Sequence, residues 1–231
     1  MAKGFVVADA DLSPERSLVG TGNKKKGLAT YRELMKNLSI KTSPEGGALA
    51  LILDNWIDSM WMEAAKSISG GVSGLNLEKM VTDSILTTIM DMQVMVHGYD
   101  FSNMLIIYWK AYKAGDIETK AKALRWLRGE YQLKRDAKED LGINNIINDG
   151  DWFDYIKIWS EFFKKINYNG FLIMIDEMIN IYRYRNSATR YNNYETMLMM
   201  YNDALQGKAK SLGIIMGGTP KALEDPVKGV F

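Results

Sequence analysis

The chain has 231 residues, of which 47% are hydrophobic and 25% are charged, and a formal net charge of +1, which is ordinary for a soluble globular protein of one large domain or two small ones. It contains no cysteine and a single histidine, His97, which excludes disulfides, thiolate metal sites and histidine-rich metal sites and argues against a histidine-dependent catalytic pair. No apolar run reaches the length of a membrane span, so we expect a cytoplasmic protein with no membrane contact, while a net charge near zero leaves a nucleic-acid partner open.

The first predicted element is a strand that starts with the apolar run 5–8 and ends near Asp9 and Asp11. Ser13 and Pro14 follow it in the pattern of a helix N-cap and a first helical residue. A buried strand that begins so early also suggests that the sequence is a piece of a longer protein.

A glycine-rich basic stretch, residues 20–27, comes next. Gly22 and Gly27 have the spacing of the glycines in a phosphate-binding loop. Leu28 and Ala29 stand where that motif requires Lys and Ser or Thr, which are the groups that reach phosphate and Mg²⁺. We expect a mobile basic loop here, and no other stretch supplies a Walker A motif.

Residues 28–166 have a helical pattern almost throughout. One helix is expected to begin at Ser43-Pro44-Glu45, another to end at Gly115, and the next to be capped by Asp116. The last helix of the region carries an apolar stripe that favours core packing over a platform for stacking bases: Trp152, Ile156, Trp159, Phe163 and Ile166. We expect this region to be a helical insertion.

The apolar run 171–175, followed by Asp176 and Glu177, predicts a strand buried on both faces, as in a parallel sheet. Ligands bind at the carboxyl ends of such strands. A buried strand that ends in Asp-Glu is the Walker B pattern of P-loop ATPases, in which the Asp helps to hold Mg²⁺ and the Glu polarises the attacking water. The alternative is a core strand followed by a helix N-terminus, where the helix dipole favours carboxylates.

Residues 178–205 are helical in pattern, with an interruption near Asn186-Ser187. They hold interleaved arginine and tyrosine residues: Tyr182, Arg183, Tyr184, Arg185, Arg190, Tyr191 and Tyr194. These side chains could contact nucleic-acid backbone and bases, or present an arginine to the phosphates of a neighbouring subunit. The pattern favours the alternative, a solvated helix face with packed tyrosine rings beneath it.

The third buried run is 212–216, and it is followed by Gly217, Gly218, Thr219 and Pro220. Thr219 can cap a helix that starts at Pro220. It also stands where ATPases of this kind carry a polar residue that senses the γ-phosphate.

Three buried strands with helices between them predict an α/β fold with a partial parallel P-loop NTPase sheet and right-handed crossovers. The expected organisation is a first strand and basic loop (1–27), a large helical insertion between the first and second strands (28–166), and the Walker B and sensor strands (167–231).

The order and spacing of several short motifs across the whole chain resemble a family, the P-loop ATP-binding proteins of BREX-type bacterial phage-defence systems, which are related to AAA+ ATPases. The motifs are Asp11–Arg16, Tyr31–Leu38, Trp126–Glu130, Ile175–Glu177, Asn192–Glu195, Gly218–Pro220 and Glu224–Pro226.

This resemblance implies the strand order 5-1-4-3-2, in which the present strands are numbers 2, 3 and 4 and are neighbours in the sheet. It also implies a Walker A loop upstream of residue 5, so the chain is expected to be a truncated ATPase domain. The strand 212–216 would then have an open edge, and an unpaired apolar edge promotes self-association.

The resemblance also implies roles for single residues. Asp176 would hold Mg²⁺ and contribute to the ATP site, Glu177 would be the general base, and Thr219 would be the sensor. The arginine acting in trans would be one of three, Arg183, Arg185 or Arg190. Asp9 and Asp11 would lie near the same edge of the sheet. The parent protein would be an ATPase, whereas this chain without a phosphate-binding loop is expected to bind neither ATP nor Mg²⁺ and to be inactive.

The function expected from these observations is ATP hydrolysis coupled to work on DNA or on a partner in phage defence, with DNA and other defence proteins as partners. One alternative is a non-catalytic module that binds protein or DNA. A weaker alternative is a Mg²⁺-dependent nuclease that uses Asp9, Asp11, Asp176 and Glu177, which would have to converge within metal-bridging distance.

Overall fold

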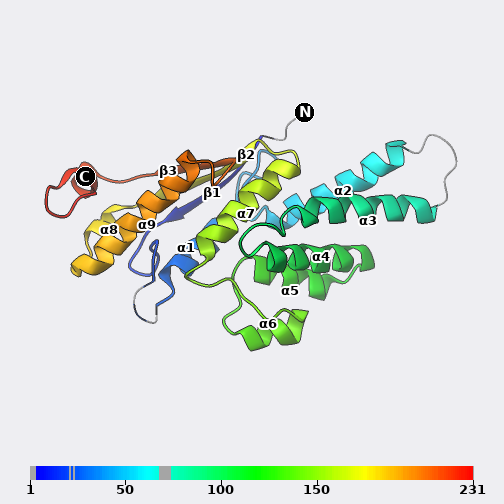
Figure 1. Ribbon diagram of the computed structural model, residues 1–231, viewed down its shortest axis with the longest axis horizontal. Coiled ribbons are helices and arrows are strands. Elements are labelled where there is room, and N and C mark those ends of the chain that lie inside the picture. Colours follow the sequence, from blue (N-terminus) through cyan, green and yellow to red (C-terminus); the bar gives the residue numbers. More distant parts are fainter. Residues whose placement is uncertain (1–3, 21, 23, 68–73, 231) are drawn as a thin grey trace. The chain divides into compact units, whose positions relative to one another are not determined.

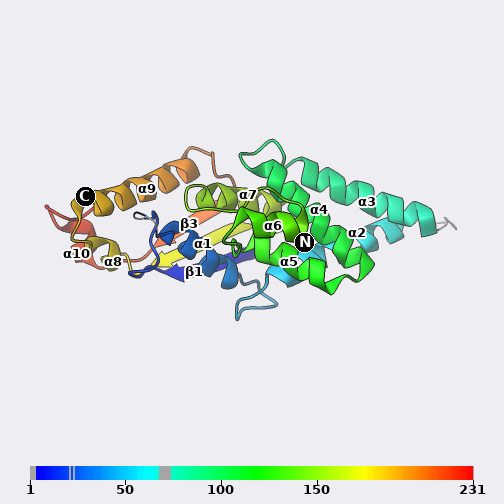
Figure 2. The same ribbon diagram turned by 90° about the horizontal axis from the view of Figure 1, so that it is seen from below.

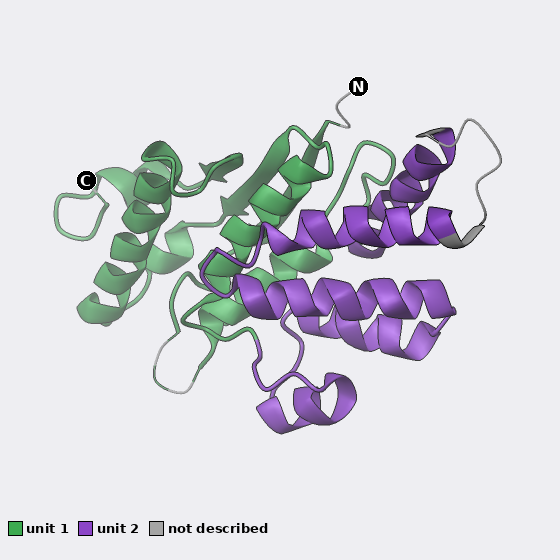
Figure 3. Cartoon of the chain, turned by 45° about the vertical axis from the view of Figure 1, so that its right-hand side comes forward, with its two compact units in different colours: residues 1–47, 147–231 green, residues 48–146 purple. Residues whose placement is uncertain are grey.

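The computed structural model describes residues 4–20, 22, 24–67 and 74–230 (Figure 1). The chain divides into two compact units, which Figure 3 shows in different colours. Unit 1 contains Met1–Gly47 and Ile147–Phe231, and unit 2 contains Ala48–Ile146. Residues 28–47 and 147–166, which we assigned from the sequence to the helical insertion, therefore belong to unit 1.

The centre of unit 1 is a parallel sheet of three strands in the order β1-β2-β3. The strands are β1 (Phe5–Asp11), β2 (Gly170–Asp176) and β3 (Leu212–Met216). Each contains one of the three predicted apolar runs, and β2 lies in the middle, so the predicted α/β class and the predicted parallel neighbours are confirmed.

Five helices of unit 1 accompany this sheet in the described residues. They are α1 (Lys26–Lys36), α7 (Trp152–Lys165), α8 (Ile179–Tyr182), α9 (Ser187–Leu205) and α10 (Pro220–Glu224). Strands that lie side by side in chain order and are joined by right-handed crossovers place the crossover helices on a single face of the sheet. Figure 2 shows α7 and α9 on the same side of the strands.

The two faces of the sheet consequently differ. On the helix-covered face the alternate residues of β1 and β2 are buried: Val6, Ala8, Ala10, Phe171, Ile173 and Ile175. On the opposite face Phe5, Met174 and Ile215 are 54%, 36% and 54% exposed. The expectation that the strands would be buried on both faces is wrong for this chain, because Val7 and Leu172 on the second face are only half-buried and the other three apolar side chains are exposed.

The two edges of the sheet differ as well. Val7 of β1 forms an antiparallel bridge with Ser39, with N–H···O distances of 3.0 and 2.8 Å. In the described part of the chain β3 pairs with β2 alone, so its outer edge is open, as the predicted strand order requires.

Aromatic packing fixes α7 and α1 against the covered face. The Trp159 and Phe163 rings stack at 5.2 Å, and the Phe163 ring meets the Phe171 ring edge-on, also at 5.2 Å. The indole N–H of Trp159 donates to the Tyr31 hydroxyl of α1 at 3.1 Å. The prediction that this aromatic stripe is core is confirmed.

Two predicted helix starts are wrong. No helix follows Ser13, because its hydroxyl accepts the N–H groups of Glu15 and Arg16 in a turn that ends before a helix can propagate. The helix expected at Ser43 begins later, as α2 (Leu49–Ser67), since Ser43 is held in a tight two-way backbone pairing with Ile40.

Unit 2 is helical in its described residues. It comprises α2, α3 (Gly74–Met90), α4 (Gly98–Ala114), α5 (Ile117–Leu127) and α6 (Lys134–Leu141). Gly115 ends α4 in the left-handed conformation, and the Asp116 side chain caps α5 by accepting the Thr119 N–H at 3.0 Å, as predicted.

A membrane-spanning helix is not found in the described part of the chain, since no helix there is both long and apolar enough.

Candidate active site

The predicted carboxylates and Thr219 lie where the three strands end. Asp11 and Asp176 are register partners at the carboxyl ends of β1 and β2. Thr219 follows the end of β3 after two glycines. The carboxyl edge of a parallel sheet is where ligands bind in α/β proteins, so the fold places these groups at the expected edge.

Asp176 is the last residue of the central strand, and its carboxylate is exposed. Its Oδ1 accepts the N–H of Glu177 at 2.7 Å, and its carbonyl accepts the N–H of Leu12 at 3.0 Å. The Asn180 side chain donates to the Leu12 carbonyl at 2.8 Å. The turn after β2 and the turn after β1 are therefore tied together, which fixes the backbone that carries the Asp176 carboxylate.

Glu177 has a positive φ of 62°, in the left-handed region that residues with a side chain rarely adopt. Such backbone strain is found at functional sites, where the surrounding structure holds it in place. Neither carboxylate caps a helix, because α8 begins two residues after Glu177, its N-cap is Met178, and no side chain donates or accepts there. Side-chain capping by these two residues is thus absent, while a helix N-terminus does follow the strand, as the helix-dipole alternative requires.

Gly217 and Gly218 allow β3 to end close to Asp176. A Cβ on Gly217 would lie 2.4 Å from Oδ1 of Asp176, and one on Gly218 would lie 3.1 Å from the Cβ of Met178. Both distances are too short for ordinary packing. We gave these glycines no role from the sequence, although a Gly-Gly pair directly after an apolar run is a signal for close backbone approach.

Thr219 precedes α10, whose first residue is Pro220, so the predicted helix start is confirmed. The Thr219 side chain makes no capping hydrogen bond, although its carbonyl accepts the N–H of Ala222. Its hydroxyl is exposed at the edge of the sheet and is not used to hold the helix.

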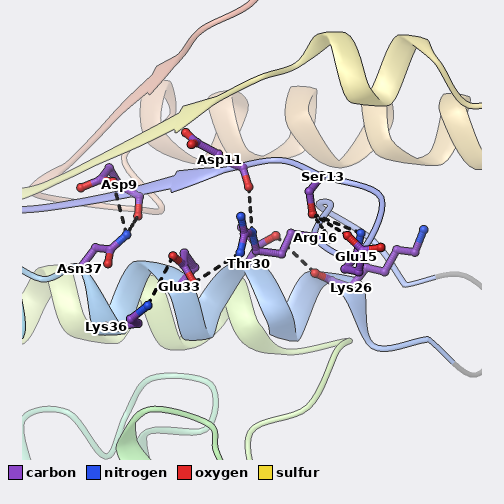
Figure 4. A network of polar contacts seen from close by, with 10 residues as sticks. All are labelled: Asp9, Asp11, Ser13, Glu15, Arg16, Lys26, Thr30, Glu33, Lys36 and Asn37. Carbon is purple, nitrogen blue, oxygen red and sulfur yellow. Dashed lines mark hydrogen bonds and ion pairs between the residues drawn. The ribbon is translucent and has the colours of Figure 1, made fainter.

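The acidic end of β1 is held by α1 and by the turn after the strand (Figure 4). Asn37 donates to the carbonyl and to Oδ2 of Asp9, at 3.0 and 3.3 Å. Arg16 donates through Nε to the carbonyl of Asp11 at 2.9 Å and pairs with Glu33 at 3.5 Å. Asp9 is therefore tethered to Asn37, whereas the Asp11 carboxylate points away from Arg16 (Figure 4).

The basic stretch 20–27 is fixed at both ends by one carboxylate. Asp149 accepts the N–H of Gly20 at 2.7 Å and that of Leu28 at 2.9 Å. Lys26 is buried and donates to the Tyr184 hydroxyl at 3.0 Å. The prediction that this loop is mobile includes Thr21 and Asn23, which lie outside the described residues.

The three candidate arginines have different surroundings. Arg183 and Arg185 are exposed, with Arg183 3.4 Å from the Asn180 side-chain oxygen. Arg190 is half-buried and donates to the Tyr184 carbonyl at 2.9 Å. Within the described residues no hydrogen bond or ion pair joins any of the three to the carboxyl edge of β2.

The carboxylates do not form a multi-ligand metal centre. Across residues 4–20, 22, 24–67 and 74–230, no group of three or more His, Cys, Asp or Glu side chains could hold a metal ion. The convergence that the nuclease alternative requires is therefore not seen. A Mg²⁺ ion bound through one carboxylate, water and substrate phosphates needs no such group.

Comparison with curated proteins finds no match, and comparison with solved structures finds none either. Comparison with protein families matches residues 1–231, the whole chain, to the family described as BREX system ATP-binding protein BrxC/D. The observed strand order and the Asp-Glu pair at the end of β2 agree with the resemblance drawn from the sequence motifs. The chain belongs to the BrxC/D family of BREX system ATP-binding proteins, which associates it with ATP binding and phage defence.

Proposed function

We propose that this chain contributes the metal-binding and water-activating side of a P-loop, AAA+-type ATPase that drives DNA-directed or partner-directed work in phage defence. The observation that carries the proposal is the placement of Asp176 and Glu177 directly after the central strand of a parallel sheet. Ligand chemistry in such sheets takes place at this edge.

Asp176 is the residue that would hold Mg²⁺, through water. Its carboxylate is exposed, and Oδ2 is free of protein partners in the described residues, so hard oxygen ligation is available. Bound Mg²⁺–ATP would supply a charge-neutralised γ-phosphoryl group open to attack by water. The residues present therefore fit a Mg²⁺ ion, and they account only for the metal-binding side of a nucleotide site.

Glu177 would accept a proton from the attacking water. It is exposed, and its backbone is held in an unusual conformation that sets its direction from the end of β2. Thr219, with a hydroxyl that does not cap α10, would hydrogen-bond the γ-phosphate from the neighbouring strand. Arg183 and Arg185 are the exposed candidates for contact with the phosphates of an adjacent subunit.

Phosphate binding itself requires a loop that the 231 residues do not encode, because no Gly-rich stretch in them ends in Lys-Ser or Lys-Thr. We propose that this loop pairs with the present residues from outside this sequence, and that the chain alone does not hydrolyse ATP.

A second candidate function, a non-catalytic interaction module, is favoured by the open edge of β3 and the exposed apolar residues beside it. Exposed strand edges are templates for pairing with another chain. The occupant we propose is a second copy of this chain, paired through β3.

ATP turnover is the test of the ATPase. It is measured on this chain joined to, or mixed with, the polypeptide that carries the phosphate-binding loop, and on the Glu177→Gln variant. We expect Glu177→Gln to lower turnover by about a hundredfold or more while ATP still binds, since glutamine cannot accept the proton.

Glu63→Gln is the matched control, because Glu63 is an exposed glutamate on α2 in unit 2. It should leave turnover unchanged. Turnover that persists in Glu177→Gln, or a complete protein that folds without binding ATP, would remove the ATPase proposal and leave the interaction module.

A further inference from the structure

A cavity of about 430 Å³ lies in unit 1 between the first turns of α9 and the loop that follows α10. Its volume falls within the range of roughly 300–1,000 Å³ that is usual for small-molecule sites. Ser187, Arg190, Tyr191 and Tyr194 contribute from α9, and Lys228 contributes from the loop. We call it the α9 pocket.

The charge of the α9 pocket is of one sign. Among its lining residues the charged ones are Arg190 and Lys228, and no aspartate or glutamate accompanies them. Neither cation forms an ion pair with a carboxylate in the part of the chain that the structure describes. Two cations that line one concavity without an ion-paired carboxylate attract an anion.

The carboxylate closest in sequence, Asp225, is engaged in shaping the loop. Its Oδ1 accepts the N–H groups of Val227 and Lys228, both at 2.9 Å, and its Oδ2 accepts the Tyr182 hydroxyl at 3.0 Å. These hydrogen bonds lower the pKa of the Asp225 carboxyl. Asp225 therefore holds the loop that carries Lys228. Its negative charge also acts on the Tyr194 hydroxyl, as the positive charge of Arg190 does, so the attraction of the pocket for an anion comes from two lining cations against this one carboxylate outside the lining.

The walls of the pocket are joined by hydrogen bonds. The Tyr194 hydroxyl donates to the carbonyl of Lys228 at 2.9 Å, which connects α9 to the loop. Arg190 uses Nη1 to reach the Tyr184 carbonyl, and this contact orients a guanidinium with further donors. The site is thus prepared before a ligand arrives.

From this combination we infer that the α9 pocket binds the phosphate group of a nucleotide. The fork of Arg190 matches phosphate oxygens, Lys228 adds a point charge, and the Ser187 hydroxyl is a further donor. Tyr191 is 62% exposed and offers a ring face on which a base can stack. Two of the interleaved arginine and tyrosine residues of this segment would then contact the nucleotide: Arg190 its phosphate and Tyr191 its base.

The nucleotide has two sources with the same chemistry, a free mononucleotide or a unit of single-stranded DNA. The test uses fluorescein-labelled 5′-phosphorylated oligothymidylate and, as a competitor, unlabelled thymidine monophosphate. Binding is followed by fluorescence anisotropy in EDTA, so that it is independent of Mg²⁺ and of the ATPase proposal.

We expect saturable binding that weakens with salt, and a loss of affinity of about tenfold or more in Lys228→Ala, the size of one charge-assisted contact. Arg190→Lys, which keeps the charge and loses the fork, should also weaken binding. Competition by thymidine monophosphate identifies a mononucleotide site, whereas its failure to compete identifies single-stranded DNA as the ligand.

Lys221→Ala is the matched control. Lys221 and Lys228 lie over the same Tyr182 ring, at 5.7 and 5.9 Å from its centre, and only Lys228 lines the pocket. Thermal melting checks that each variant is folded. An absence of saturable binding, or an equal loss of affinity in Lys221→Ala and Lys228→Ala, would overturn the inference.

Discussion

The two faces of the sheet in unit 1 are built from the same three strands, yet they have opposite environments. Phe171 and Ile173 of β2 are fully buried under the helices, while Met174, their neighbour in sequence, is 36% exposed on the other face. Successive residues of a strand point to opposite faces, so a difference of one position decides between core and surface.

The difference arises from topology. Since β1, β2 and β3 are adjacent in chain order, right-handed crossovers place their helices on one side. Parallel sheets are usually covered on both faces, so apolar strand sequences fit both faces even where a chain covers only one. A continuous apolar run therefore identifies a parallel strand, but it does not show whether one face or both faces of that strand are buried.

The largest loss of stability should come from a large-to-small substitution on the helix-covered face. Phe171→Ala removes a ring that packs against Phe163, and we expect a loss of about 3–5 kcal/mol in the free energy of unfolding. Urea denaturation measures it. Met174→Ala, on the open face of the same strand, should cost about 1 kcal/mol or less. Equal losses in the two variants would show that the faces are equivalent.

A smaller effect concerns pH. Burial raises the pKa of Tyr31, beneath the covered face, far above its usual value of 10.0. A raised folded-state pKa means that the stability from the neutral hydroxyl is fully present below pH 10.0 and is lost as pH rises above it, because only the unfolded chain ionises. Tyr31→Phe should therefore reduce the alkaline loss of stability by about 1.4 kcal/mol per pH unit above that value.

Unfolding curves between pH 9 and pH 11 or so check this dependence. Tyr191→Phe serves as the comparison, because the Tyr191 ring is exposed on α9. This variant controls for the loss of a hydroxyl from an exposed ring, and a Tyr31→Phe slope equal to that of the unchanged chain would contradict the expectation.

The smallest effect on stability is expected on the open face. Ile215→Lys places a cation beside the β3 edge and should change the free energy of unfolding by about 0.5 kcal/mol or less. It should nevertheless weaken self-association, since charges on edge strands oppose pairing with another chain. Sedimentation equilibrium measures the association constant.

Met199→Lys is the control for this experiment, because Met199 is an apolar residue of similar exposure that lies on α9 and not on β3. It should leave the association constant unchanged. The proposal that β3 is the site of association would be wrong if the chain stays monomeric at high concentration. It would also be wrong if the two lysine substitutions lower the association constant equally.

The sequence by itself determined the strands, the parallel sheet and the position of the Asp-Glu pair at the end of β2. Runs of apolar residues bounded by glycine and acidic residues carry that information locally, because the presence of a strand and the position of its carboxyl end follow from a few adjacent side chains. The break between α8 and α9 and the caps at Gly115 and Asp116 were predictable for the same reason.

Only the tertiary structure decided the remaining features. The exposure of the second face of the sheet depends on which side every crossover takes, and the role of Gly217 depends on Asp176, which is distant in sequence. The positive φ of Glu177 and the assignment of Arg190 to a pocket with Lys228 likewise result from packing between distant segments. Local patterns specify elements, whereas contacts between elements specify the chemistry available at their ends.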